Sequence, residues 1–261
     1  MTFTDKTALV TGSTSGIGLA IATELARAGC NLALHGLESA ADSREICDRI
    51  RDQFKVSICY FDTDVAKGGA CRQMIERVRT DCGSLDILVN NAGIQHVAPV
   101  DQFPEERWDA ILAVNLSAAF HCTAAALPGM RGSGYGRIIN IASAHGLVAS
   151  PNKSAYVAAK HGLIGLTKVT ALETAGEGIT CNAVCPGWVL TPLVEKQIQA
   201  RTVRDGVSYE EATKALLFEK QPSGAFTKPA DIGSLVVFLC TEAAANMTGA
   251  SLPIDGGWTA R

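Results

Sequence analysis

The chain has 261 residues, of which 47% are hydrophobic and 19% are charged. That length supports one large hydrophobic core and is short for two, so we expect a single domain over residues 1–261. The formal net charge of -3 excludes the basic field that binding to nucleic acid or another polyanion requires.

The first residues and the cysteines bear on cellular location. The start, Met1 to Lys6, is polar and lacks the apolar core of a signal peptide, and no apolar stretch reaches the roughly 20 residues of a membrane helix. We therefore expect a cytoplasmic protein with no membrane partner. The nine cysteines are scattered singly and form no C-x-x-C pair, so we expect reduced, mostly buried thiols and no bound metal.

Short apolar runs alternate with helical patterns along the whole chain. The runs predict strands near residues 7–10, 31–35, 56–61, 87–90, 137–142, 180–184 and 251–254. Alternation at this spacing predicts an α/β fold, a doubly wound parallel sheet of seven strands with helices on both faces. Ligands bind such sheets beyond the carboxyl ends of the strands, where the polar motifs of this chain fall.

The first predicted strand runs into a glycine-rich turn, Thr11-Gly12-Ser13-Thr14-Ser15-Gly16-Ile17-Gly18, and then into a helical pattern. Glycines allow backbone N–H groups and a helix N-terminus to come close to a pyrophosphate. The spacing differs from G-x-G-x-x-G, but the strand, turn and helix context is the one that dinucleotide binding requires. The turn therefore predicts a dinucleotide cofactor.

Tyr156 and Lys160 stand four residues apart in a helical stretch, with Ser143 thirteen residues before the tyrosine. This spacing places the phenol and the ammonium on one helix face, one turn apart. A free phenol has a pKa of about 10, and a neighbouring cation stabilises its anion. Taken alone, such a pair is usually an amphipathic surface pair. Together with the glycine-rich turn, it predicts proton transfer to or from an alcohol or carbonyl oxygen.

Residues 191–228 interrupt the alternation with a polar, helix-prone insertion that contains no predicted strand. A long segment of this kind beside a cofactor site is typical of a substrate lid. The alternative is a solvated helical excursion without a function of its own.

Several motifs occur together and in order: Thr11 to Gly18, Asn90-Asn91-Ala92-Gly93, Asn115, Ser143, Tyr156-x-x-x-Lys160 and Pro186-Gly187. With this set the chain resembles the short-chain dehydrogenases/reductases over essentially its full length. The resemblance implies a single-domain Rossmann-type fold, a nicotinamide cofactor and a homotetramer.

The resemblance also implies a role for each member of a catalytic tetrad. Tyr156 is the general acid/base, Ser143 holds the substrate oxygen, and Lys160 lowers the Tyr156 pKa while it binds the nicotinamide ribose. Asn115 bends a helix and positions a water in the proton relay. From the residues alone, an asparagine in a helix is usually a local partner of the backbone.

The implied cofactor site draws on the glycine-rich turn, the ends of later strands and the active-site helix. Its members are Gly12, Thr14, Ser15, Gly16, Ile17, Gly18, Gly36, Leu37, Asp64, Val65, Asn91, Ala92, Gly93, Tyr156, Lys160, Pro186, Gly187, Val189 and Thr191. No Arg or Lys lies at residues 13–15 or 35–38, and a 2′-phosphate would meet Glu38 instead. We therefore expect NAD as the cofactor rather than NADP.

Polar and cationic residues gather around the tetrad. A His, a Lys and a Gln beside the reacting group suit a small anionic substrate, and a carboxylate is the simplest such anion. Here the chain is similar to the subgroup of the family that oxidises D-3-hydroxybutyrate. The substrate site that this implies contains Gln95, Ser143, His145, Lys153, Tyr156, Trp188, Gln197 and Trp258. Some of them also have an ordinary structural explanation: His145 as a strand-end cap, Lys153 as a solvated lysine, and Trp188 or Trp258 as a core or interface tryptophan.

We expect reversible, NAD-dependent oxidation of D-3-hydroxybutyrate to acetoacetate. A same-fold alternative is a 3-oxoacyl-thioester reductase, which would prefer NADPH and a basic patch for a phosphopantetheine carrier, and neither is evident in the sequence. Another class is a non-catalytic Rossmann module that senses the NAD/NADH ratio. The intact Ser143, Tyr156 and Lys160 argue against a sensor, which has no need of a tuned phenol.

Overall fold

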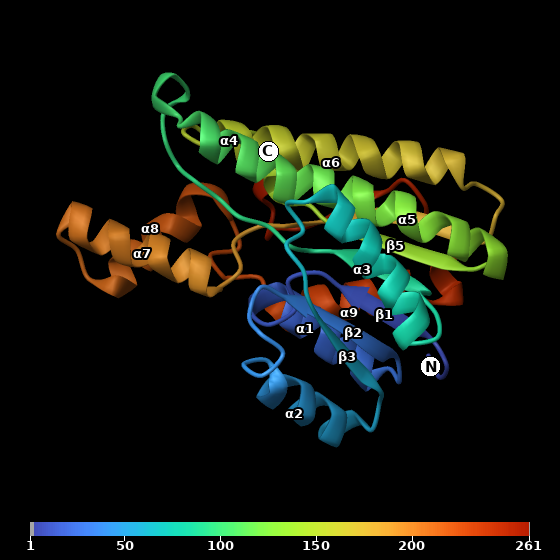
Figure 1. Cartoon of the computed structure of the whole chain (residues 1–261). Coiled ribbons are helices and arrows are strands. Elements are labelled where there is room, and N and C mark those ends of the chain that lie inside the picture. The colour runs from blue at the N-terminus through green and yellow to red at the C-terminus, as the bar shows by residue number, and fades with distance from the viewer. Residues whose placement is uncertain (1–2, 261) are drawn as a thin grey trace.

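The computed structural model describes residues 3–260, apart from the side chain of Leu193, and is built on one parallel sheet (Figure 1). Its seven strands are β1 (Thr7–Val10), β2 (Asn31–Gly36), β3 (Ile58–Asp62), β4 (Ile87–Asn90), β5 (Gly136–Ile141), β6 (Ile179–Pro186) and β7 (Ser251–Ile254). Their order in the sheet is β3-β2-β1-β4-β5-β6-β7. The predicted doubly wound α/β fold is confirmed.

The strand order reverses direction between β1 and β4. From β1 the chain builds outward to β2 and β3, then returns to place β4 on the other side of β1, in the register Leu9 opposite Leu88. A reversal of this kind leaves a crevice beyond the strand ends, because the connecting segments on its two sides leave in opposite directions. The fold therefore puts its crevice where β1 and β4 end.

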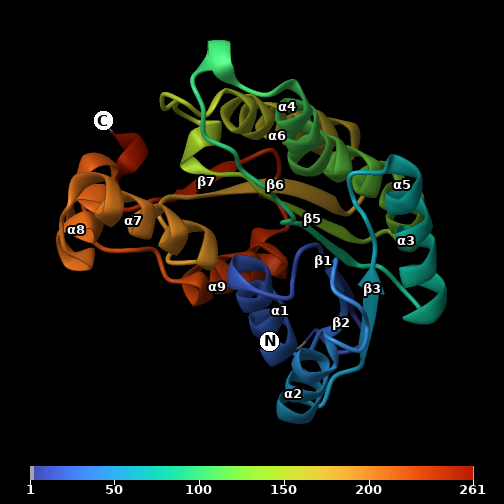
Figure 2. The ribbon, with the colours of Figure 1, turned by 60° about the vertical axis from the view of Figure 1, so that its left-hand side comes forward.

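Helices connect the strands. They are α1 (Gly16–Arg27), α2 (Arg44–Phe54), α3 (Gly68–Asp81), α4 (Glu105–Leu112), α5 (Ala118–Ser133), α6 (Ser154–Glu173), α7 (Pro192–Asp205), α8 (Tyr209–Lys220) and α9 (Pro229–Leu239). A π-helical turn, Ala113–Ser117, joins α4 to α5. Figure 2 shows α1, α2 and α9 on one face of the sheet and α3, α5 and α6 on the other.

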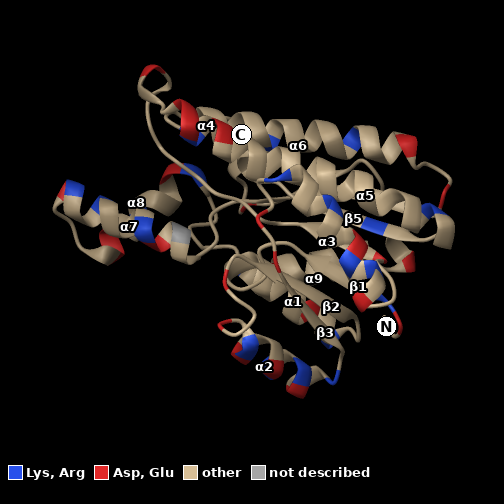
Figure 3. Cartoon of the chain, viewed as in Figure 1, with Lys and Arg blue, Asp and Glu red and all other residues tan. Residues whose placement is uncertain are grey.

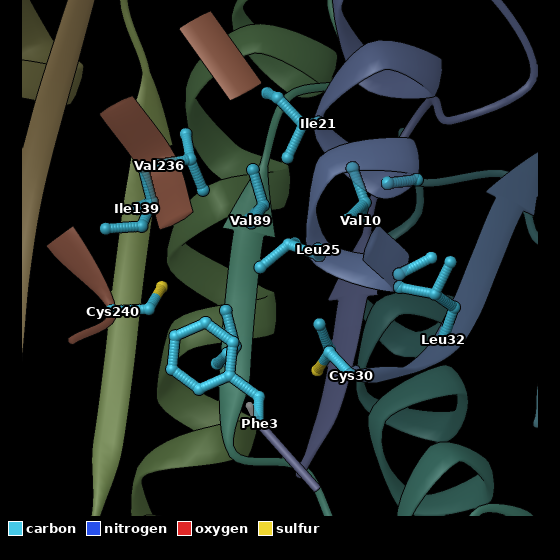
Figure 4. Close-up of a cluster of buried hydrophobic side chains, with 14 of the residues drawn as sticks. Phe3, Val10, Ile21, Leu25, Cys30, Leu32, Val89, Ile139, Val236 and Cys240 are labelled. Atoms are coloured by element: carbon cyan, nitrogen blue, oxygen red, sulfur yellow. The ribbon is translucent and has the colours of Figure 1, made fainter. Parts of the chain in front are cut away.

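The two faces of the sheet have separate hydrophobic cores because successive strand residues point to opposite sides. Val10 packs with Ile21 of α1 and Val236 of α9 in one core, part of which is drawn in Figure 4. Its neighbour Leu9 packs with Met74 of α3 in the other core. A strand that is buried on both faces reads as a continuous apolar run, which is why Ala8-Leu9-Val10 carries no alternation.

The strand ends differ slightly from the sequence expectation. β3 begins at Ile58 rather than Val56, since Lys55 ends α2 with a left-handed backbone (φ 58°) and the chain needs two more residues to reach the sheet. β6 continues through Pro186, because Pro186 aligns with Ile254 of the edge strand β7. The longer β6 carries the following segment directly to the crevice.

The insertion at residues 191–228 forms two helices, α7 and α8, which project away from the sheet (Figure 1). Thr191 caps α7, and Ser208 caps α8 through a reciprocal capping box with Glu211. The described residues of the insertion contain no regular strand, only one bridge between Val189 and Thr227. A third hydrophobic cluster, which includes Trp188, packs these helices onto the body of the protein.

One helical run contradicts the expectation about apolar length. Glu105–Ser133 joins α4, the π-helical turn and α5, contains an 18-residue window with a mean hydropathy of 1.7, and is long and apolar enough to cross a membrane. The sequence statement that no stretch reaches this length is therefore wrong. The run packs against α3, α6 and β5, as a core helix does, so length and composition alone do not indicate a membrane span. Cytoplasmic location stays a prediction.

Candidate active site

Two connected cavities occupy the crevice beyond the strand ends. An inner cavity of about 160 Å³ lies against Ser143, Tyr156 and Lys160. A larger cavity of about 440 Å³ follows the glycine-rich turn and the ends of β2 and β4. Asn91 and Thr191 line both cavities. The inner cavity is small compared with drug-sized pockets of about 300–1,000 Å³, so it suits a small substrate.

The hydroxyl, phenol and ammonium of the predicted tetrad meet in the inner cavity. Ser143 follows β5 with extended backbone, and its Oγ accepts a hydrogen bond from the His145 backbone N–H at 3.1 Å. Tyr156 and Lys160 lie on the first turns of α6, with Lys160 Nζ 5.6 Å from the centroid of the Tyr156 ring. Lys160 Nζ donates to the Ile141 carbonyl at 2.7 Å, which fixes the buried ammonium under the cavity.

Burial sets the protonation of the two groups. Desolvation raises the pKa of Tyr156 above its ordinary value of 10, and a hydrogen bond with Ser143 opposes this rise. Desolvation lowers the pKa of Lys160 to about 8. At neutral pH the phenol is therefore protonated and the ammonium charged. The expected lowering of the Tyr156 pKa by Lys160 stays a prediction.

Asn115 lies in the π-helical turn between α4 and α5. Its side chain forms two hydrogen bonds with the backbone of Ile94, each at 2.9 Å. Asn115 Oδ1 accepts from the Ile94 N–H, and Asn115 Nδ2 donates to the Ile94 carbonyl. A cavity of about 10 Å³ separates Asn115 from Lys160, close to the minimum that holds one water. Asn115 does not line the inner cavity itself, so any part in catalysis passes through Ile94 or through that small space.

The residues predicted for the substrate site come together. All eight line the inner cavity: Gln95, Ser143, His145, Lys153, Tyr156, Trp188, Gln197 and Trp258. They come from the segment after β4, the turn after β5, the start of α6, the segment after β6, the insertion helix α7 and the C-terminal turn. Their roles toward a substrate stay predictions.

Aromatic rings form one wall of the inner cavity. The His145 ring stands edge-on to Tyr156 and to Trp258, with centroid distances of 5.9 and 5.0 Å. Trp188 lies 5.5 Å from Trp258, and Lys153 Nζ sits 5.0 Å from the Trp188 ring. The wall presents apolar surface to a short alkyl chain, with a cation at its edge.

His145 and Lys153 differ in charge. Desolvation, helped by the Lys153 charge, lowers the pKa of His145 to about 3, so the imidazole is neutral. Its Nε2 is 2.9 Å from Ser150 Oγ. Desolvation lowers the pKa of Lys153 to about 8, so its ammonium is charged at neutral pH. Lys153 is the cation that a carboxylate would meet in this cavity.

Among the buried side-chain donors of residues 3–260 that lack a hydrogen-bond partner are Gln95 Nε2 and Trp188 Nε1. Both residues line the inner cavity. An unpaired buried donor costs about 1–3 kcal/mol, and a ligand that accepts a hydrogen bond removes that cost. The cavity thus offers donors as well as a cation, and an anionic or carbonyl oxygen satisfies both.

The residues predicted for the cofactor divide between the two cavities. The larger cavity is lined by Gly12, Thr14, Ser15, Gly16, Ile17, Gly18, Gly36, Leu37, Asp64, Val65, Asn91, Ala92, Gly93 and Thr191. The inner cavity takes Tyr156, Lys160, Pro186, Gly187 and Val189. The glycines are needed sterically, since a Cβ on Gly18 would lie 2.1 Å from the Gly12 oxygen. Gly12 itself has a left-handed backbone, φ +64°.

Glu38 occupies the far end of the larger cavity. Its carboxylate accepts from the Leu37 N–H at 3.1 Å and from Thr14 Oγ1 at 3.4 Å. The same carboxylate would lie 2.3 Å from a Cβ on Gly36, so the glycine makes room for it. The lining of this cavity contains acidic residues and no Lys or Arg.

Sequence reasoning missed His35. Its buried ring accepts from the Gly12 N–H at Nδ1, 2.9 Å, and its Nε2 lies 2.8 Å from the Thr63 carbonyl. Burial lowers the pKa of His35, which suits a neutral ring that bridges two loops. Its position at the end of β2, next to the glycine turn in a parallel sheet, was the available signal. Ile94, Val114 and Val194 also line the cavities and gave no signal beyond apolar character.

The fold and this constellation define an oxidoreductase of a large family. Residues 6–202 match the family model for short chain dehydrogenases, and the chain belongs to the short-chain dehydrogenase/reductase family, whose members use a nicotinamide cofactor. It is 55% identical over 256 residues to the D-beta-hydroxybutyrate dehydrogenase of Cupriavidus necator, covering 98% of both chains. It is 48% identical to the enzyme of the same name from Rhizobium meliloti, covering 98% of this chain and 99% of that one.

A solved relative contains a bound nicotinamide cofactor. The L-sorbose reductase of Gluconobacter frateurii, described in complex with NADPH and L-sorbose, superposes with a TM-score of 0.94 at 30% identity. The match covers 100% of this chain and 99% of that one. The family fold thus serves different substrates, D-beta-hydroxybutyrate and L-sorbose among them, and side chains must decide the choice of substrate.

Proposed function

We propose that this chain catalyses the reversible oxidation of D-3-hydroxybutyrate to acetoacetate with NAD. The observation that carries the proposal is the inner cavity, whose lining combines Lys153 and Gln95, with its unpartnered Nε2, with Ser143 and Tyr156. A 3-hydroxy acid has a carboxylate two carbons from its hydroxyl carbon, so both groups have partners in one small space. The similarity to two D-beta-hydroxybutyrate dehydrogenases supports the same substrate.

The residues present fit a nicotinamide dinucleotide. The crowded glycines Gly12 and Gly18 bring backbone close to the start of α1, where a pyrophosphate binds favourably. Glu38 supports NAD, because its carboxylate favours a ribose hydroxyl as donor and repels a 2′-phosphate. When bound, the cofactor supplies the acceptor for the hydride that leaves the substrate C3.

In the oxidative direction, the phenolate form of Tyr156 takes the proton of the substrate hydroxyl, and Ser143 donates a hydrogen bond to the same oxygen. Burial keeps Tyr156 mostly protonated at neutral pH, so the phenol is ready to donate in the reductive direction. Lys160 stabilises the phenolate through its charge. A water in the space of about 10 Å³ between Lys160 and Asn115 carries the proton onward.

Lys153 attracts the substrate carboxylate, and Gln95, His145 and Gln197 orient it by hydrogen bonds. Gln197 belongs to α7, so carboxylate binding favours closure of α7 and α8 over the cavity. Closure excludes water before hydride transfer. We further propose a cytoplasmic homotetramer, as the family resemblance implies.

The test is NADH formation with D-3-hydroxybutyrate, run beside the L-enantiomer, the methyl ester and NADP. We expect activity with the free D-acid and NAD, and a loss of about 10²–10⁴ in kcat for Tyr156→Phe. Tyr135→Phe is the matched control, since the Tyr135 hydroxyl bonds the Cys240 carbonyl at the opposite end of the sheet. Equal activity on the methyl ester would refute the carboxylate site.

A further inference from the structure

A third cavity lies outside the inner one, between the lid helix α7 and the segment after β4. Its volume is about 500 Å³, larger than the inner cavity of about 160 Å³. The two cavities share Gln95, Lys153 and Gln197, the residues assigned above to the substrate carboxylate. A molecule in the outer cavity therefore meets the same three side chains as a molecule in the inner cavity.

The charged side chains that line this outer cavity are all cations. Its charged lining residues are Lys153, Lys196, Arg201 and Arg204, and its lining includes no Asp or Glu. Figure 3 shows Lys and Arg in blue on α7, the helix that contributes Lys196, Arg201 and Arg204 to the lining. Val97, Ala200 and Leu216 add apolar surface between the cations. A cation-lined hollow with apolar patches suits a small carboxylic acid better than a neutral molecule.

Neighbouring carboxylates compensate only part of this charge. Asp205 pairs with Arg201 at 3.3 Å and with Arg204 at 2.6 Å, and Glu219 pairs with Arg201 at 3.2 Å. Four cations against two carboxylates leave the cavity positive. Lys196 forms no ion pair within the part of the chain that the structure describes.

We propose that the outer cavity is an anion-binding site that captures the carboxylate substrate before it reaches the inner cavity. The proposal rests on the proposed function, because it assigns the route by which that substrate enters. Exposed cations around a concave surface raise the local concentration of anions, and salt screens the effect over about 8–10 Å. From the outer cavity, the carboxylate moves to Lys153 by exchanging one set of cations for another.

The first experiment is kinetic. The KM for D-3-hydroxybutyrate, at saturating NAD, should rise severalfold from low to high NaCl. Lys196→Gln should raise the low-salt KM about threefold, with a smaller effect on kcat, and should weaken the salt dependence. Lys196→Arg should restore both. Lys168→Gln is the matched control, an exposed lysine on α6 that lines neither cavity.

A second experiment needs no turnover. Acetylation of Lys196 by an N-hydroxysuccinimide ester, read by mass spectrometry, should slow by about twofold or more with malonate at low salt. Neutral malonamide should give no protection, and labelling of Lys168 serves as the internal reference. Lack of turnover with protection intact would refute the proposed substrate and leave the anion site standing. Unchanged labelling together with a wild-type salt response in Lys196→Gln would overturn the anion site.

Discussion

His145 and Lys153 lie at the same cavity, yet burial leaves one neutral and the other charged. The pKa of an imidazole starts at 6.5, and desolvation brings that of His145 to about 3, well below neutral pH. The ammonium starts at 10.5, and a similar cost leaves the pKa of Lys153 at about 8. Of these two residues, only Lys153 is charged at neutral pH, and His145 is a neutral ring that can form hydrogen bonds.

The first prediction concerns pH and Lys153. Its pKa is lowered, so the charge is complete below about 8 and is lost as the pH rises through that value. We expect the KM for D-3-hydroxybutyrate to be flat near neutral pH and to rise at more alkaline pH. Lys153→Gln should have a KM about tenfold higher that no longer changes in this range. KM and kcat measured across pH 8 for both proteins check this.

The pKa of Lys160 also falls to about 8, but its charge acts on the Tyr156 phenol rather than on the carboxylate. Its deprotonation should therefore appear in kcat. If the alkaline rise in KM persists in Lys153→Gln, another group controls carboxylate binding.

A second prediction at this scale concerns the cofactor. Glu38→Gln removes the carboxylate beside Gly36 and Thr14, and Leu37→Arg adds a cation for a 2′-phosphate. The double variant should raise the ratio of kcat/KM for NADP over NAD by about tenfold or more. Glu45→Gln, an exposed carboxylate in the first turn of α2, is the control and should leave the ratio unchanged. If the double variant leaves the ratio of kcat/KM for NADP over NAD unchanged, Glu38 does not select the cofactor.

At the scale of elements, the sequence predicted what depends on local pattern. The glycine turn between β1 and α1 was predicted because its glycines are needed for backbone shape. The π-helical turn at Asn115 was not predicted from the residues, because apolar periodicity does not reveal one extra residue in a turn. Only the contact with Ile94, twenty-one residues earlier, explains why the helix widens there.

The prediction for the glycine turn uses two glycines in helices. Gly18→Ala places a Cβ 2.1 Å from the Gly12 oxygen, so the turn must shift. We expect a loss of about 2 kcal/mol in the free energy of unfolding and weaker NADH binding. Gly132→Ala in α5, where an added Cβ meets nothing within 4 Å, should leave NADH affinity unchanged. Thermal unfolding measures the loss of stability, and fluorescence titration measures the affinity for NADH. Equal effects of the two substitutions on both quantities would contradict the steric role of Gly18.

At the scale of the whole molecule, seven strands and a helical insertion were predictable because buried parallel strands are short apolar runs. The position of the cavities was predictable from the strand ends. The shapes of the cavities were not predictable, because they depend on how α7 and α8 pack against Trp188 and Trp258. His35 and the outer cavity also emerge only from tertiary packing, since no local pattern joins α7 to the segment after β4.

The last prediction concerns the motion of α7 and α8 against the sheet. The side chain of Gln221, directly after α8, accepts a hydrogen bond from the backbone N–H of Trp188 at 2.7 Å and so anchors this pair of helices. Both helices carry mostly exposed residues. We expect their amide hydrogens to exchange readily in the free protein and to become protected by NAD and acetoacetate together, a pair that cannot react. The carboxylate should be needed, because under the proposed function it binds both Gln197 of α7 and Lys153 of the body, which line the same cavity. Hydrogen–deuterium exchange of peptides from 192–205 and 209–220 measures this, with peptides of β4 and β5 as the rigid reference.

Gln197→Ala should lose much of the protection from acetoacetate while it keeps the effect of NAD alone. Full protection by NAD without acetoacetate would mean that the cofactor, and not the substrate, closes the two helices.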